Sequence, residues 1–483
     1  MSLDLVIRGG TVVTPAGTRT CDVGIRDGRI AALGAGLAGA RTLEAAGRLV
    51  LPGGVDSHCH IEQLSSFGIL CADDFHSATV SAAFGGTTTV IPFCAQHRTD
   101  ALPAVLADYH ARAREKAVID YAFHLILANP DEATLGTHLP EAIRGGIRSF
   151  KIFMTYDRMR HADEQILDVM AAARREGALV MVHAENHGVI SWLANRMVKQ
   201  GNTLPRYHAI AHTRGSEAEA INRIIALAEL MDCPVLVVHV STIEGIELIR
   251  RARARGLKVY GETCPQYLFL TAKDIDAGLA GAAFCCSPPP RDEAAQEACW
   301  AGLKDGTLGV YSSDHAPYRM DASGKLPKGE ATTFKEMANG VPGLELRLPL
   351  LFTFGYKAGR ITLEEFVEMT AGAHAKLYGL YPRKGAIVEG ADADLALWDP
   401  EKRVTIEATR DNAGYTPYKG RQLTGWPVTV LSRGEVIVDD GKVSAARGRG
   451  QFIAREPTEA MKPLGRAVPE LAQLAAWNTP LQP

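Results

Sequence analysis

The chain has almost no excess charge of either sign. It carries 52 Lys and Arg residues against 55 Asp and Glu residues, a net charge of −3. That balance excludes the basic surface typical of proteins that bind nucleic acid or anionic membranes. No apolar run reaches the roughly 18–20 residues that a membrane span requires. The first residues, MSLDLVIRGG, also lack the basic segment and apolar core of a secretion signal. We therefore expect a cytoplasmic protein with no nucleic-acid or membrane partner.

Low-complexity tracts and blocks of like charge are also missing. Hydrophobic residues make up 46% of the 483 residues and charged residues 22%, so the chain is not largely disordered. Its length predicts one large domain with a smaller companion. The nine cysteines are an odd, scattered set, and Cys94, Cys233 and Cys264 lie inside apolar runs. We interpret them as reduced, buried thiols.

From about Val50 onward, apolar β-rich runs alternate with helical segments eight times. The runs cover residues 51–60, 85–93, 119–127, 146–154, 178–185, 234–241, 258–265 and 309–317. The intervening segments include 162–177, with apolar residues at helical spacing, and 216–231, which opens with the capping-box pattern of Ser216 and Glu219. Continuous apolar runs are typical of buried parallel strands. Eight such units predict an α/β fold, a closed (β/α)₈ barrel. A doubly wound sheet is the alternative, but no Gly-rich phosphate loop follows an early strand.

Both ends of the chain have a different sequence pattern from the eight repeated units. The first 50 residues alternate short strand-like runs with glycine turns, and similar runs return at 385–400 and 428–443. We predict that residues 1–52 and 384–450 build one β-sandwich domain and that residues 53–383 form the barrel. Residues 451–483 are expected to form a C-terminal arm, either on the surface or in a subunit contact.

Side chains that bind metals lie at the carboxyl ends of several predicted strands. They are His58, His60, Lys151, His183, His239 and Asp314. A single histidine in an apolar strand is more often a hydrogen-bonded core residue than a ligand. These residues, however, occupy equivalent positions in different units of one repeat, at the barrel face where catalysis occurs. His58 and His60 are two apart in a strand, so both point to the same side. We interpret the set as a metal centre.

Lys151 lies in the apolar run SFKIFM. Most lysines are exposed or ion-paired, and an ammonium is costly to bury. Burial and nearby cations would both lower its pKa. A neutral amine can add carbon dioxide and form a carbamate, which is an anionic bridge suited to two divalent ions. Two such metals share a hydroxide and lower its pKa.

Longer motifs carry a family resemblance that runs nearly from end to end. They are GGVD (53–56), AAFGGTTTVIPF (82–93), FKIFMTY (150–156), VMVHAEN (180–186), VVHVST (237–242), GETCPQYLFL (261–270), SPPPR (287–291), SSDHAP (312–317) and NGVPGLELRLPLL (339–351). With these motifs the chain resembles the cyclic amidohydrolases of the dihydropyrimidinase/D-hydantoinase group, in the amidohydrolase superfamily. The resemblance implies a barrel with a β-sandwich, a homotetramer and a binuclear centre.

The resemblance also implies roles for single residues. Carboxylated Lys151 would bridge the metals, one bound by His58, His60 and Asp314, the other by His183 and His239. The metals are usually zinc, although manganese, cobalt or iron fit the same ligands. Tyr156 would polarise the substrate carbonyl, and Ser287 and Asn339 would hold the cyclic amide edge through backbone atoms. From the residues alone, Tyr156 fits simple packing at the rim, Ser287 a cap and Asn339-Gly340 an ordinary turn.

The predicted activity is hydrolysis of a cyclic amide C–N bond. A hydroxide attacks the ring carbonyl, Tyr156 stabilises the oxyanion, and Asp314 acts first as base and then as acid. A dihydropyrimidine or 5-substituted hydantoin would yield an N-carbamoyl amino acid. Segments 61–67 and 157–160 and residue His187 depart from the group pattern and lie at the rim, where loops set specificity.

Those departures leave alternatives open. Allantoinase or another cyclic ureide hydrolase is one. Dihydroorotate is disfavoured, because Glu62 stands where dihydroorotases place an arginine and would repel the substrate carboxylate at the rim, although Arg158 or Arg160 could replace that arginine. A catalytically inactive, dihydropyrimidinase-like scaffold protein is the non-enzymatic alternative. It predicts gaps among the metal ligands, and this sequence has none.

Overall fold

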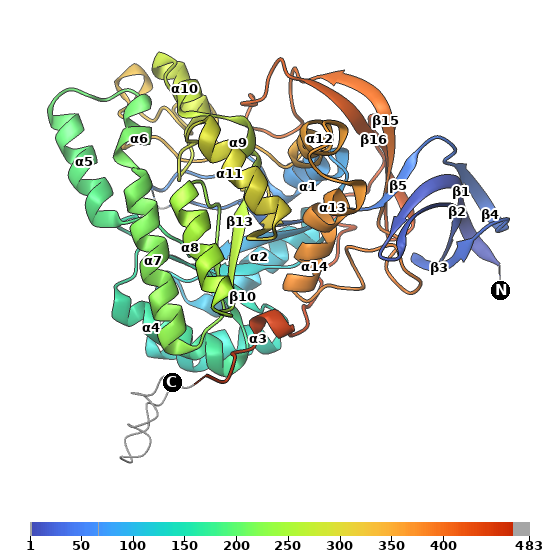
Figure 1. The fold of residues 1–483 in the computed structure, drawn as a ribbon, viewed down its shortest axis with the longest axis horizontal. Helices are drawn as coiled ribbons and strands as arrows, with labels where there is room; N and C mark the ends of the chain where they lie inside the picture. The colour runs from blue at the N-terminus through green and yellow to red at the C-terminus, as the bar shows by residue number, and fades with distance from the viewer. Residues whose placement is uncertain (1, 66, 467–483) are drawn as a thin grey trace, which may run out of the picture.

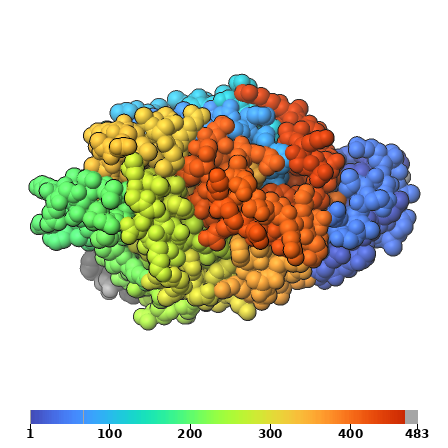
Figure 2. Space-filling view, turned by 90° about the horizontal axis from the view of Figure 1, so that it is seen from above, coloured from blue at the N-terminus to red at the C-terminus, as the bar shows by residue number. Residues whose placement is uncertain are grey.

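The protein is described by a computed structural model that covers residues 2–65 and 67–466. A parallel β-barrel surrounded by helices forms its body, and a second sheet projects at one end (Figures 1 and 2). The eight-unit (β/α)₈ prediction is confirmed, since each predicted run contains barrel strand. The barrel strands are β6 (Gly54–Cys59), β7 (Thr87–Ala95), β8 (Asp120–Tyr121), β9 (His124–Ile126), β10 (Ser149–Phe153), β11 (Leu179–His183), β12 (Val235–Val237), β13 (Val259–Thr263) and β14 (Leu308–Tyr311).

Parallel pairing runs in chain order from β6 to β14, with the short β8 beside β7. The segment after β14 then returns to the first strand. His315 forms a parallel bridge with Cys59, and the His60 amide donates to the His315 carbonyl over 2.7 Å. These contacts join the first and last strands above the sheet. Asp314 is thereby brought next to the residues that end β6.

Strand residues alternate between two cores. In β11, Leu179 and Met181 pack in the cluster that fills the barrel, whereas Val180 and Val182 belong to the larger cluster under the helices. This alternation follows from the two-residue period of a strand. It places His183, the last residue of β11, on the same side as Met181, inside the barrel mouth.

The helices cover the outside of the barrel (Figure 1). Their ranges are α1 (Phe75–Phe84), α2 (Leu102–Lys116), α3 (Leu139–Arg144), α4 (Asp163–Glu176), α5 (His187–Lys199), α6 (Arg206–Ala211), α7 (Arg214–Met231), α8 (Ile243–Ala254), α9 (Pro265–Phe269), α10 (Ala272–Ile275), α11 (Glu293–Lys304), α12 (Arg347–Leu351), α13 (Leu363–Val367) and α14 (Ala373–Leu377). The expected helix over 162–177 is α4, which Gly177 ends in the left-handed conformation.

The capping box expected at Ser216 is wrong. Helix α7 begins two residues earlier, and Thr213 is its N-cap, accepting a hydrogen bond from the Ser216 amide. Glu219 instead accepts from Asn186, at the start of α5, and pairs with Arg223. Threonine, like serine, is a preferred capping residue. The Glu219 side chain binds Asn186 and so does not hydrogen-bond to a backbone amide at the start of α7.

The two chain ends build the second sheet together, as predicted. Its path runs β18-β17-β16-β15-β5-β1-β2-β3, with β4 beside β1. The strands are β1 (Leu3–Thr14), β2 (Gly17–Arg26), β3 (Arg29–Gly34), β4 (Gly39–Glu44), β5 (Leu49–Pro52), β15 (Leu395–Thr405), β16 (Gln422–Ser432), β17 (Glu435–Asp439) and β18 (Lys442–Val443). Strand β5 pairs with both β1 and β15, so it joins the N-terminal and C-terminal strands.

The predicted C-terminal arm is described only as far as residue 466, and its remainder, 467–483, lies outside the described residues. The described part runs under the barrel (Figure 1). Arg455 is buried there and donates to the Phe123 carbonyl and to Ser149. Farther along, the Asp232 carboxylate accepts from the backbone amides of Leu464 and Gly465. This stretch therefore packs against its own barrel.

Candidate active site

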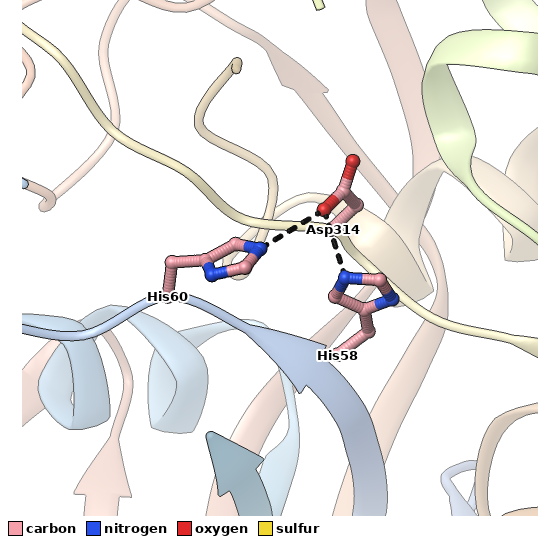
Figure 3. A group of neighbouring side chains, drawn as sticks. All are labelled: His58, His60 and Asp314. Carbon is pink, nitrogen blue, oxygen red and sulfur yellow. Dashed lines mark ion pairs between the residues drawn. The ribbon is translucent and has the colours of Figure 1, made fainter. Parts of the chain in front are cut away.

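His58, His60 and Asp314 form a compact cluster at the barrel mouth. Nε2 of His58 lies 3.1 Å from Oδ1 of Asp314, and Nε2 of His60 lies 3.4 Å from the same oxygen. The two histidines come from the end of β6 and the carboxylate from the loop after β14 (Figure 3). One ligand atom from each side chain lies within 4.8 Å of the others, a spacing that fits one metal ion. The two histidines of the predicted His-x-His pair therefore point to one candidate metal site.

The outer nitrogens of both histidines are already engaged. Nδ1 of His58 lies 2.6 Å from Glu262, and Nδ1 of His60 lies 2.7 Å from Gln63. An acceptor at Nδ1 leaves the lone pair on Nε2, the atom that faces Asp314. Such partners are typical of metal-binding histidines, because they set both tautomer and ring orientation. The donor set therefore fits a divalent cation.

The other predicted ligands converge on the same place. Nζ of Lys151 lies 3.0 Å from Nε2 of His58. The rings of His183 and His239 are 4.6 Å apart, and that of His239 is 5.6 Å from His58. Nε2 of His183 is bound to Glu185 at 2.7 Å, so its Nδ1 is the nitrogen left for a metal. All six predicted ligands thus lie at one end of the barrel.

Burial favours the neutral imidazoles of His58, His183 and His239, which is the state that binds metals. Together with the positive charge of Lys151, it holds the pKa of His58 well below the usual range. Burial likewise lowers the pKa of His183 and of His239. For Lys151, burial lowers the pKa to about 8 despite the nearby carboxylates of Asp314 and Glu262. Part of the Lys151 population therefore carries an uncharged, reactive amine near neutral pH.

Three site residues have left-handed backbones that only glycine adopts readily. The φ angles are +71° at Tyr156, +42° at His239 and +47° at Asp314. Each such conformation costs on the order of 1–3 kcal/mol and persists only where surrounding contacts impose it. At His239 the backbone amide donates to Glu262 over 3.1 Å. The strain turns these side chains from the strand direction into the barrel mouth.

A cavity of about 100 Å³ opens above the cluster. The residues predicted to contact substrate, Tyr156, Ser287 and Asn339, line it together with all of the predicted metal ligands except His58. Burial and the charge of Glu185 raise the pKa of Tyr156, so its phenol stays protonated and able to donate. Rim side chains Leu64, Phe67 and Met159 also line it. Two of the departing segments, 61–67 and 157–160, therefore border the cavity.

One expectation about the rim is wrong. Glu62 does not line the cavity; its carboxylate binds Lys116 of α2 and the Phe75 amide at the start of α1. Its left-handed backbone, φ +48°, turns the side chain away from the barrel axis. Glu62 therefore places no negative charge beside a substrate. The neighbouring Gln63 faces the site instead and holds His60.

Several site residues were not singled out from the sequence. Glu262 contacts two predicted ligands, and Glu185 links His183 to His212. A signal for Glu262 was present, since a carboxylate inside the apolar run of β13 requires a buried partner. His315, next to Asp314, is buried between Asp73 and the Gly343 amide, which fixes the loop that carries Asp314.

Comparison with known proteins gives a consistent result. Residues 49–437 match the model of the amidohydrolase family. The chain belongs to this family. It is 41% identical over 461 residues to a D-hydantoinase of Rhizobium radiobacter, covering 94% of this chain and 99% of that protein. Among the described residues of this amidohydrolase, no helix is long and apolar enough to cross a membrane.

Solved structures agree with this assignment. A D-hydantoinase from Bacillus sp. AR9 superposes with a TM-score of 0.91 at 41% identity, covering 94% of this amidohydrolase and all of that chain. A dihydropyrimidinase from Brevibacillus agri gives 0.90 at 38% identity, covering 94% and 99%. The family resemblance inferred from the motifs is confirmed, and with it the barrel fold.

Proposed function

We propose that this protein opens the ring of a cyclic amide by hydrolysis, with a dihydropyrimidine or 5-substituted hydantoin as substrate and an N-carbamoyl amino acid as product. The observation that carries the proposal is the convergence of six metal-type side chains and Tyr156 at one end of the barrel, where all of them except His58 line one cavity. The relatives named D-hydantoinase support the substrate class. A scaffold protein has no need to keep this set, nor the strained backbone at His239 and Asp314.

We propose that these residues hold two divalent ions, with zinc as the metal. His58, His60 and Asp314 would hold one ion and His183 and His239 the other, with a carbamate on Lys151 between them. When bound, the ions supply an activated water and a Lewis acid for the ring carbonyl. The neutral imidazoles and the low pKa of the Lys151 amine support this arrangement.

We assign the proton transfer to Asp314. Its Oδ1 faces His58 and His60, while Oδ2 accepts from Gln266 over 3.3 Å. Gln266 holds the carboxylate without neutralising it. Asp314 therefore takes the proton of the attacking water and returns it to the ring nitrogen as the C–N bond breaks.

In this proposal, Tyr156 stabilises charge on the carbonyl oxygen. Its phenol remains protonated because burial and Glu185 raise its pKa, and a protonated phenol donates best to a developing oxyanion. Backbone atoms of Ser287 and Asn339 would hold the amide edge of the ring beside it. The apolar rim side chains Leu64 and Phe67 favour an uncharged ring substituent.

Three further proposals accompany this activity. Residues 1–52 and 384–450 form the β domain, residues 53–383 the barrel and residues 451–483 the arm. The assembly is a homotetramer, as the family resemblance implies. The protein acts in the cytoplasm on a small molecule, and its nine cysteines, all free and buried, support a reducing compartment.

A panel of ring-opening assays tests the activity. Purified protein reloaded with zinc or manganese in bicarbonate is given dihydrouracil, phenylhydantoin, hydantoin, allantoin or dihydroorotate, and loss of ultraviolet absorbance is followed. We expect turnover of dihydrouracil or phenylhydantoin, abolished by chelation and restored by metal. Preference for allantoin would favour the ureide alternative. Absence of turnover and of bound metal would leave the scaffold alternative.

A further inference from the structure

Lys325 is a fully buried lysine whose ammonium, among the described residues, hydrogen-bonds only to backbone carbonyls. It lies in the loop between β14 and α12, and its exposed fraction is 0%. Nζ donates to the carbonyl of Cys285 over 2.8 Å and to that of Ala338 over 3.2 Å. Within residues 2–65 and 67–466, no carboxylate forms an ion pair with it. Burial accordingly lowers its pKa to about 8.

The two carbonyls belong to the two segments proposed to hold the substrate ring. Cys285 is two residues before Ser287, and Ala338 directly precedes Asn339. These segments meet once more, because the Gly340 amide donates to the Cys285 carbonyl over 3.0 Å. Lys325 therefore ties together, from behind, the two backbones that line one side of the cavity.

Backbone contacts in the loop around Lys325 hold its ammonium beside the Cys285 and Ala338 carbonyls. The Lys325 amide donates to the Arg319 carbonyl over 2.8 Å. A side chain at Gly324 would come within 2.2 Å of that carbonyl, so the turn needs glycine there. Beside the ammonium, Cys285 packs in an apolar cluster that includes Met337.

Stability alone is a poor reason for a lysine at this position. Burying an ammonium costs free energy that neutral carbonyls only partly return, and an apolar side chain of similar length would fill the space without that cost. Hydrogen bonds from a charged donor are short and directional, however. They hold two carbonyls at a set separation, which apolar packing does not do.

We propose that Lys325 is a positioning residue that sets the spacing between the Ser287 and Asn339 backbones and thereby controls substrate affinity. This inference rests on the proposed ring-opening activity. Backbone contacts of this kind are equally present before and during the reaction, so their loss raises KM and leaves kcat nearly unchanged. Lys325 does not line the cavity, and among the described residues its ammonium contacts no predicted metal ligand.

The test compares Lys325→Met, which keeps the length and loses the donors, with Lys328→Met in the same loop. Lys328 is exposed and paired with Glu336, which makes it a matched control. We expect Lys325→Met to raise KM at least tenfold, with kcat within threefold and metal content unchanged. Amide hydrogen exchange should quicken in segments 284–288 and 337–341. Lys328→Met should change none of these. Lys325→Gln, which retains one donor group, should give an intermediate KM.

Several outcomes would overturn the inference. An unchanged KM for Lys325→Met, with or without faster exchange, refutes the role in substrate positioning. If Lys325→Met loses both bound metal and kcat, Lys325 has a general structural role instead. If Lys325→Met does not fold, Lys325→Gln decides on the same two readouts. Failure of the proposed activity is distinct, because the unmodified enzyme then turns over no panel substrate, while hydrogen exchange still tests the link between the two segments.

Discussion

Nδ1 of His58 lies 2.6 Å from Oε1 of Glu262, and neither side chain has any exposed surface. The same oxygen accepts the backbone amide of His239 over 3.1 Å. One carboxylate therefore orients a predicted ligand from each half of the metal centre. It connects the ends of strands β6, β12 and β13 behind the ligands.

Replacing Glu262 should weaken metal binding without touching a ligand. We expect Glu262→Ala to lower metal affinity about 10- to 100-fold, because His58 loses the acceptor that holds its ring and tautomer. Titration against a competing chelator measures the change. Glu262→Gln retains a carbonyl oxygen and should keep most of the affinity, and Glu293→Ala, at the surface, should have no effect. Equal affinities in the alanine variant and the unmodified protein would contradict this role.

Lys151 offers a direct test of the carbamate. Lys151→Ala should lose bound metal and turnover, because the anionic bridge is missing. Acetate or propionate should restore part of the activity by occupying the vacated space as a carboxylate. Elemental analysis and the ring-opening assay report both effects. Lys335→Ala, an exposed lysine near the rim, serves as the comparison. Full activity of Lys151→Ala without added acid would rule the bridge out.

Tyr156→Phe removes a single hydrogen-bond donor from the cavity. If the phenol stabilises the oxyanion, kcat should fall about 10²- to 10³-fold while KM changes little. Steady-state kinetics with dihydrouracil or phenylhydantoin measure both constants. Tyr207→Phe on α6 controls for the substitution itself. A kcat within threefold of the unmodified enzyme would show that Tyr156 only packs at the rim.

Lys384 is the buried centre of an ion cluster between the barrel and the second sheet. Its ammonium lies 2.7 Å from Asp120 of β8, 3.1 Å from Asp392 and 2.6 Å from Asp394, next to β15. Burial opposes the charge, yet these carboxylates raise the pKa of Lys384. Lys384→Met removes the ammonium that pairs with Asp394 and the nearer cation of Asp120, while Arg383 stays beside Asp392 and Arg433 beside Asp120, and it should cost about 3–5 kcal/mol.

Thermal unfolding measures the effect of Lys384→Met, which we expect as a fall in Tm of several degrees. The control is Lys376→Met, whose side chain is half exposed and paired with Glu368. That surface pair should contribute no more than about 1 kcal/mol. Equal Tm values for the two variants would show that the buried cluster adds nothing to stability.

Local pattern was enough to predict much of the architecture. Apolar runs of strand length, repeated eight times, require burial on both faces, and a barrel inside a ring of helices provides it. His58 and His60 share one target because the strand period places them on one side. Lys151 was found as a charged residue inside an apolar strand, and His183 as a polar residue at the end of one. The longer motifs then identified the family.

Contacts between distant segments lay beyond such reasoning, because the folded chain alone sets them. The Glu62 side chain turns toward Lys116 and the Gln63 side chain toward His60. Both orientations depend on the left-handed backbone at residue 62, which a glutamate at this position does not predict. Glu262 meets His58 across 204 residues. Lys325 reaches carbonyls on two other loops. Periodicity places a side chain on a face, but its partner depends on how strands and loops assemble in space.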